Sequence, residues 1–140
     1  MQVTVSIVNY NTKTLLDQCL NSLQKNANVA QLEIIVIDNK SHDGSVPMLK
    51  SKYPQVKLIQ NYSNQGFSKA NNQAIKAATS EYVLLLNSDT IVKPRAIEQL
   101  CDFMKNNPDV DMVGPRLLND DGSIQPSISK LPNLWYVFLN

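Results

Sequence analysis

The chain has 140 residues, a length that corresponds to about one domain. Its hydrophobic fraction of 43% is sufficient for a packed core and excludes an intrinsically disordered chain. The formal net charge of +1, from 13 basic and 12 acidic residues, lacks the basic footprint of a nucleic-acid-binding protein. An anionic ligand must therefore be held by local groups.

The cysteines and the absence of targeting patterns favour a cytoplasmic protein. Cys19 and Cys101 form no CxxC motif and fall in helical apolar patterns, so both are predicted to be buried free thiols, as in a reducing compartment. The N-terminus has no basic region followed by a long apolar stretch, which argues against a signal peptide. No apolar run reaches the ~18 residues of a membrane span.

An alternation of apolar and polar residues over 3–8 predicts a first strand that ends near Tyr10. Apolar residues then recur at helical spacing, and Asn11 or Thr12 can cap the resulting helix. The predicted apolar face of this helix consists of Leu15, Leu16, Cys19, Leu20 and Leu23.

The β-branched run over 34–37 predicts a second strand that is buried on both faces. A polar loop over 38–45 follows it, and its only histidine, His42, is expected to be exposed to solvent. Ser45 is predicted to cap a short helix that ends near Tyr53.

The later elements follow from the same patterns. They are a strand over 56–60, a helix over 68–78, a strand over 82–86, a helix opened by Pro94, a short strand at 112–113 and a hairpin over 117–124 that turns at Asp121-Gly122. The apolar run 84–86 is typical of a strand buried on both faces of a parallel sheet. Strands that alternate with helices predict right-handed βαβ units, and hence an α/β fold with a mostly parallel sheet flanked by helices.

Polar clusters follow four of the predicted strands. They are Asn9-Tyr10-Asn11, Asp38-Asn39, Asn64-Gln65-Gly66 and Asn87-Ser88-Asp89. The carboxyl ends of parallel strands share one edge, where open α/β sheets bind ligands. Four neighbouring strands span roughly 15 Å, which is the order of length of a nucleoside diphosphate with a sugar attached.

Two of these residues suit a nucleobase. Tyr10 offers a ring on which a base can stack, or else it packs at the strand end. Asp38 can accept a hydrogen bond from a base N–H, which uracil and thymine carry at N3 and cytosine does not. The alternative for Asp38 is to cap its own loop through Ser41 or Asp43.

The other clusters suit phosphate and metal. Gly66 leads into a helix N-terminus, which favours anions, and Lys69 either reaches a diphosphate or is a solvated helix lysine. Asp89 can hold a divalent cation through oxygen, with Asn87 on a ribose hydroxyl or on the metal. The alternative for this last segment is an ordinary turn after a strand.

These segments resemble, in order and spacing, the motifs of the family 2 glycosyltransferases of GT-A fold. The matching segments are VSIVNYN over 5–11, VIDNKSHDGS over 36–45, NQGFSKANNQAI over 64–75 and LNSD over 86–89. Details such as Gly114-Pro115-Arg116 are most similar to the bacterial rhamnosyltransferase-like branch. The resemblance implies a Rossmann-like sheet, a UDP- or dTDP-sugar donor, Mg²⁺ or Mn²⁺, and inverting transfer to an acceptor hydroxyl.

The resemblance also assigns roles by position. Asp89 is implied as the metal ligand, and the implied nucleotide-binding residues are Asn9, Tyr10, Asn11, Asp38, Gly66, Lys69, Asn87 and Ser88. Asn87 stands where the family motif has its first carboxylate, so Asp89 is the only charged ligand there. We therefore expect weak metal binding that depends on the diphosphate.

Members of this family extend well past 140 residues, and their acceptor-side half carries the general base. We therefore expect residues 1–115 to form the nucleotide-sugar-binding subdomain and residues 116–140 to begin a truncated acceptor-side region. This chain alone would bind donor but transfer sugar poorly. Its apolar ending over 131–139 is expected to pack on the sheet or to form a homodimer.

The family further implies an acceptor saccharide on a lipid carrier, in cell-surface polysaccharide synthesis at the inner face of the membrane. Other functions remain open, including a catalytically incompetent nucleotide-binding fragment. A sugar-nucleotide nucleotidyltransferase would need a Gly-rich loop after the first strand, and a dinucleotide-binding domain would need GxGxxG there. The segment Asn9-Tyr10-Asn11-Thr12 has neither, nor the acidic pair of a receiver domain.

Overall fold

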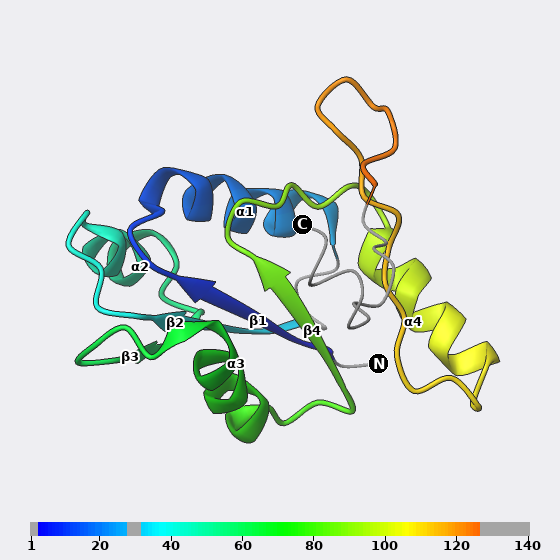
Figure 1. The fold of residues 1–140 in the computed structure, drawn as a ribbon, viewed down its shortest axis with the longest axis horizontal. Helices are drawn as coiled ribbons and strands as arrows, with labels where there is room; N and C mark the ends of the chain where they lie inside the picture. Colours follow the sequence, from blue (N-terminus) through cyan, green and yellow to red (C-terminus); the bar gives the residue numbers. More distant parts are fainter. Residues whose placement is uncertain (1–2, 28–31, 127–140) are drawn as a thin grey trace, which may run out of the picture.

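The computed structural model describes residues 3–27 and 32–126, in which alternating strands and helices build one parallel sheet. The strands are β1 (Val3–Asn9), β2 (Leu32–Asp38), β3 (Lys57–Gln60) and β4 (Tyr82–Asn87), in the order β3-β2-β1-β4. The helices are α1 (Lys13–Asn26), α2 (Ser45–Lys52), α3 (Gly66–Ala77) and α4 (Ala96–Asn106). All three strand pairings are parallel, which confirms the predicted α/β fold (Figure 1).

Each face of the sheet has its own core because side chains alternate along a strand. Val3, Val5 and Ile7 of β1 pack in one cluster with the buried face of α1. On the opposite face, Ala70 and Ala74 of α3 pack against β2. The two helices lie on opposite sides of the sheet (Figure 1), and the small alanine side chains permit α3 to approach the strands closely.

The prediction that 84–86 is buried on both faces is wrong for Leu85, which is 49% exposed. The register pairs Ser6 with Leu85, so Leu85 lies on the α3 side of the sheet. Within the described residues α3 packs against β1 and β2, and β4 is an edge strand. Only one face of β4 is therefore covered, and Leu84 and Leu86 pack against the core there.

The helix starts differ from the prediction. Leu15 is 42% exposed rather than part of the apolar face of α1, because it lies on the solvent side of the first turn. Ser45 is the first residue of α2 and not its cap; that position belongs to Gly44, which has a φ of 85°. Thr12 precedes α1 without a capping bond from its side chain.

The segment after α4 carries little regular structure. Residues 112–113 form no strand, contrary to prediction. The predicted hairpin is present as a single antiparallel bridge between Leu118 and Ile124, and the Gly122 N–H donates to the Asn119 carbonyl oxygen at 2.9 Å. The predicted apolar tail over 131–139 lies outside the described residues.

Both cysteines are free thiols as predicted, although only Cys19 is fully buried and Cys101 is half-buried. His42 is exposed, as expected. No helix in the described part of the chain is long and apolar enough to cross a membrane.

Candidate functional site

The carboxyl ends of the strands place the predicted polar clusters along one edge of the sheet. The register pairs Asn9 with Asp38 on one side of β1 and Val8 with Asn87 on the other. Asp38 and Asn87 therefore flank the end of β1, about 10 Å apart across two strand spacings. The sequence prediction of a shared edge is confirmed for these clusters, and their ligands stay predictions.

Asp38 ends β2 in a buried hydrogen-bond network. Its Oδ1 accepts from Asn9 Nδ2 at 2.7 Å, and its Oδ2 accepts from the Ser41 N–H at 2.9 Å. Asn9 is fully buried, and Nδ2 donates to Ser41 Oγ at 2.9 Å as well. Asn9 thus holds Asp38 and Ser41 in place and offers no exposed atom of its own to a ligand.

Asp38 itself is only 2% exposed. The loop-capping alternative is thus observed, through Ser41 rather than Asp43. This capping leaves part of the hydrogen-bonding capacity of Asp38 unused, because an ionised carboxylate has about four acceptor positions and two of them are occupied here. The carboxylate therefore keeps acceptor capacity for one further N–H.

The loop after β1 is clamped to the loop after β2. The Asn11 N–H donates to Ser41 Oγ at 2.9 Å, and Asn11 Oδ1 accepts from the His42 N–H at 2.8 Å. Asn11 adopts a left-handed conformation with a φ of 55°, which asparagine tolerates better than most residues. Tyr10, the residue between Asn9 and Asn11, is 49% exposed, and its stacking on a base stays a prediction.

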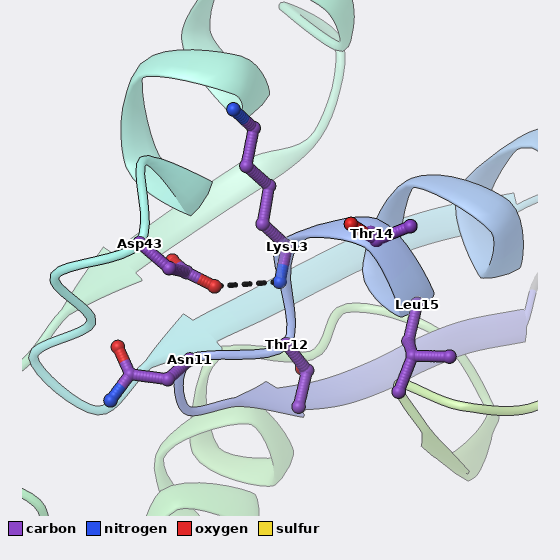
Figure 2. A pocket seen from close by; sticks show the side chains of 6 residues that line it. All are labelled: Asn11, Thr12, Lys13, Thr14, Leu15 and Asp43. Atoms are coloured by element: carbon purple, nitrogen blue, oxygen red, sulfur yellow. Dashed lines mark hydrogen bonds between the residues drawn. The ribbon is translucent and has the colours of Figure 1, made fainter.

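The N-terminus of α1 is capped from the neighbouring loop (Figure 2). Asp43 Oδ2 accepts from the Lys13 N–H at 2.7 Å, and Asp43 Oδ1 accepts from the Ser45 hydroxyl at 2.6 Å. Burial would raise the pKa of Asp43, but the hydrogen bonds from Ser45 and Lys13 outweigh it and lower the pKa. The hollow at this helix end, lined by residues 11–15 and Asp43, therefore already holds a negative charge beside the helix.

The loop before α3 is held by asparagine side chains. Asn39 Oδ1 accepts from Asn61 Nδ2 at 2.9 Å, and Asn64 Oδ1 accepts from the Gly66 N–H at 2.9 Å. Gly66 has a φ of 76° with open space around its Cα, so its backbone conformation is what favours glycine. Lys69 is exposed in the first turn of α3.

The loop after β4 presents polar atoms on the surface. Asn87 and Asp89 are exposed, and the Thr90 N–H donates to the Asn87 carbonyl oxygen at 3.2 Å to close a turn. Ser88 Oγ lies 2.9 Å from Thr12 Oγ1, which in turn donates to Asn9 Oδ1 at 2.7 Å. The β4 loop is thereby joined to the same network as Asp38.

A second set of contacts anchors this loop to α1. Ser22 Oγ accepts from the Val92 N–H at 2.9 Å, and Asn26 Nδ2 donates to the Val92 carbonyl oxygen at 2.9 Å. Because Ser22 and Val92 are buried, the bond between them is shielded from water. These two bonds fix the position at which Asp89 leaves the sheet.

The described residues contain no cluster of three or more His, Cys, Asp or Glu that would hold a metal alone. Cys19 donates to the Asn87 carbonyl oxygen at 3.7 Å, but burial, with the nearby Asp89 charge, raises its pKa to about 12. A protonated thiol is no metal ligand. Asp89 remains as one exposed carboxylate, which suits Mg²⁺ held by few protein ligands together with phosphate and water.

The sequence indicated three residues of this network only as local partners, with Ser41 as a loop cap, Thr12 as a helix cap and Asn39 as part of a polar cluster. Ser41 and Thr12 connect the loops, and Asn39 holds the loop that precedes α3. The signal that was available for Ser41 is its position three residues after Asp38 in a polar loop, a spacing typical of side-chain-to-backbone turns. No local pattern indicated the contact of Thr12 with Ser88, which is 76 residues away.

The chain matches a known family over nearly its whole length. The family described as Glycosyl transferase family 2 matches residues 4–138. Among curated relatives, the chain is 36% identical over 112 residues to a poly(ribitol-phosphate) beta-glucosyltransferase of Bacillus spizizenii, a match that covers 76% of this chain and 18% of the relative. It is 28% identical over 141 residues to an N-acetylglucosaminyl-diphospho-decaprenol L-rhamnosyltransferase of Mycobacterium tuberculosis, covering 93% and 46%.

The fold matches solved glycosyltransferase structures. TarS of S. aureus in complex with UDP-GlcNAc aligns with a TM-score of 0.70 and 26% identity, over 77% of this chain and 32% of that one. A Pyrobaculum calidifontis mannosyltransferase in complex with GDP-Man and Mn²⁺ aligns with a TM-score of 0.66 and 24% identity, over 74% and 32%, and so supports the fold alone. The chain spans less than half the length of each of these relatives.

Proposed function

Because the chain belongs to glycosyl transferase family 2 and has a GT-A-like fold, we propose that it is the donor-binding part of a glycosyltransferase that uses a UDP- or dTDP-sugar and a divalent metal. The observation that carries this proposal is the single edge on which Asp38 and the Asn87–Asp89 loop flank the end of β1. Their separation of about 10 Å allows one ligand to place its base near Asp38 and its diphosphate near Asp89.

The metal is proposed to be Mg²⁺ or Mn²⁺, held by Asp89. One exposed carboxylate binds such an ion weakly, so the diphosphate oxygens would supply further ligands. When bound, the ion would neutralise charge on the leaving diphosphate. Beside Asp89, Asn87 is exposed and Ser88 is half-buried. Both belong to the loop that would face the ribose.

The finer features of the reaction rest on the family. We propose inverting transfer to an acceptor hydroxyl, with a general base supplied from outside the described residues. The names of the two curated relatives include a poly(ribitol-phosphate) and a decaprenol-linked acceptor, which supports a role in bacterial cell-surface polysaccharide synthesis. Such acceptors would place the intact enzyme in the cytoplasm at the inner face of the membrane.

The test is calorimetric titration of the chain with UDP and with dTDP, in Mn²⁺ and again in EDTA. We expect binding that is stronger with Mn²⁺, and loss of this metal dependence in Asp89→Ala. Asp109→Ala is the matched control, because Asp109 is an exposed carboxylate in the turn after α4. Absence of binding to both nucleotides, or equal metal dependence in Asp89→Ala, would contradict the proposal.

A further inference from the structure

The Ser41 hydroxyl has its acceptor capacity filled by two donors. Asn9 Nδ2 and the Asn11 backbone N–H each lie 2.9 Å from Ser41 Oγ. A hydroxyl oxygen has two acceptor positions and one hydrogen to donate. Among the described residues, the two hydrogen bonds found at this hydroxyl are both ones that it accepts.

The assignment of both neighbours as donors is fixed by the network. The Asn11 group is a backbone amide and can only donate. The Asn9 carboxamide lies 2.7 Å from the Asp38 carboxylate oxygen, so its nitrogen must face Asp38. Its oxygen meanwhile accepts from the Thr12 hydroxyl at 2.7 Å. The Ser41 hydroxyl therefore keeps its own hydrogen to donate to a further acceptor.

This remaining donor lies close to an acceptor, the Asp38 carboxylate. The same Asn9 nitrogen bonds Asp38 Oδ1 and Ser41 Oγ, and the Ser41 N–H bonds Asp38 Oδ2. The two hydrogens of a carboxamide diverge, which separates Asp38 Oδ1 from Ser41 Oγ by about 5 Å at ordinary hydrogen-bond lengths. Ser41 is half-buried whereas Asp38 is almost covered, so the hydroxyl lies nearer the solvent.

We propose that Ser41 is a specificity-determining residue that donates its hydroxyl hydrogen to a carbonyl oxygen of the nucleobase whose ring N–H is accepted by Asp38. This inference rests on the proposed nucleotide site. The pair presents an acceptor beside a donor, so it selects a base with an N–H next to a C=O. Uracil, thymine and guanine have such an edge, whereas cytosine and adenine present a ring nitrogen acceptor in that place.

The variant Ser41→Ala alone cannot test this role, because it also removes the acceptor for Asn9 and Asn11 and so weakens the loop. A cycle that changes both protein and ligand separates the two effects. Binding of UDP, 4-thio-UDP and 2-thio-UDP is measured calorimetrically on the wild-type chain and on Ser41→Ala, at a pH where the thio bases keep their N3–H. Structural damage weakens all three ligands equally and cancels in the cycle.

We expect one of the thio analogues to bind the wild-type chain about two- to tenfold more weakly than UDP, and this difference to disappear in Ser41→Ala. The analogue that binds more weakly identifies which carbonyl oxygen of the base accepts the hydrogen bond from Ser41. Ser51→Ala is the control, because Ser51 lies on the exposed side of α2 and bonds only the Met48 carbonyl oxygen. It should keep the wild-type discrimination.

The outcomes separate this inference from the proposed function. If the wild-type chain binds UDP in a metal-dependent manner but both thio analogues show the same ratio to UDP in wild type and Ser41→Ala, Ser41 does not contact the base and the inference fails. Equal affinity of the wild-type chain for CDP and UDP overturns it as well. If the wild-type chain binds no nucleotide at all, the proposed function itself fails.

Discussion

Replacing Asn9 by aspartate tests whether the buried network sets the stability of the sheet edge. Asn9→Asp changes no volume, so it leaves no cavity. It places a second carboxylate oxygen 2.7 Å from Asp38 Oδ1 at a position with no solvent exposure. A buried charge without its partner costs about 3–5 kcal/mol, a large fraction of the ~5–15 kcal/mol that stabilises a typical domain.

The penalty should depend on pH with a defined sign. The introduced carboxyl has a pKa of about 3.9 in the unfolded chain, and the neighbouring carboxylate raises its pKa in the folded chain. A protonated carboxyl can donate to Asp38 as the Asn9 amide does, so the variant is destabilised little near pH ~4. As the pH rises through the folded-state pKa, this stability is lost and the full penalty appears.

The assay is urea unfolding followed by far-UV circular dichroism near pH ~4 and pH ~7, for wild type, Asn9→Asp and Asn21→Asp. Asn21 is an exposed residue of α1, so its variant controls for the added charge. We expect Asn9→Asp to lose several kcal/mol more than the control at neutral pH and to recover on acidification. An Asn9→Asp variant that is unfolded at neutral pH and refolds in acid would also support the reasoning. A loss equal to that of the control at both pH values would refute the reasoning.

Three further outcomes follow from other contacts. Ser22→Ala leaves the buried Val92 N–H without its acceptor, so the free energy of unfolding should fall by about 1–3 kcal/mol and the Val92 amide should exchange hydrogen faster, as measured by NMR. The pKa of Asp43 is lowered in the folded chain, so the stability that the Asp43 carboxylate contributes is present above its unfolded-state pKa and is lost as the pH falls through its folded-state pKa. In urea titrations, Asp43→Asn should therefore be less stable than wild type at neutral pH and approach wild-type stability in acid. Cys19 is buried and its pKa is raised to about 12, whereas Cys101 is half-buried, so iodoacetamide should label Cys101 first, as followed by mass spectrometry.

The strands and helices could be predicted because their patterns are local. Alternation over β1 and the β-branched run in β2 require only neighbouring residues, and their bounds agree closely with the structure. Parallel pairing then forces every polar cluster to the same edge, whatever the strand order. Some helix boundaries differ from the prediction: α3 begins at Gly66 rather than near Ser68, and Gly66 has a φ of 76°, a left-handed conformation that glycine adopts readily.

The side-chain network could not be predicted, since its partners are distant in sequence. Asn9 and Ser41 are 32 residues apart, and they meet only because β1 and β2 are adjacent in the sheet. The exposure of Leu85 likewise depends on which strands α3 covers. The apolar run 84–86 carries no information on that point, because a strand covered on one face and a strand covered on both can have the same composition.

The two ends of the candidate site differ in how far their side chains are already held in place in the absence of ligand. At the Asp38 end, groups at the ends of β1 and β2 and in the loops after them already hold each other through four hydrogen bonds, so binding a base requires little further ordering of this end. At the Asp89 end there is one exposed carboxylate and no further acidic or histidine cluster among the described residues. We therefore expect nucleotide to bind measurably before metal, and metal to bind appreciably only when phosphate oxygens complete its coordination. Because coupling between two bound ligands is reciprocal, the factor by which UDP raises the affinity for Mn²⁺ must equal the factor by which Mn²⁺ raises the affinity for UDP. A difference between the two measured factors would mean that a further equilibrium, such as a second Mn²⁺ site or Mn²⁺–UDP association in solution, contributes to binding.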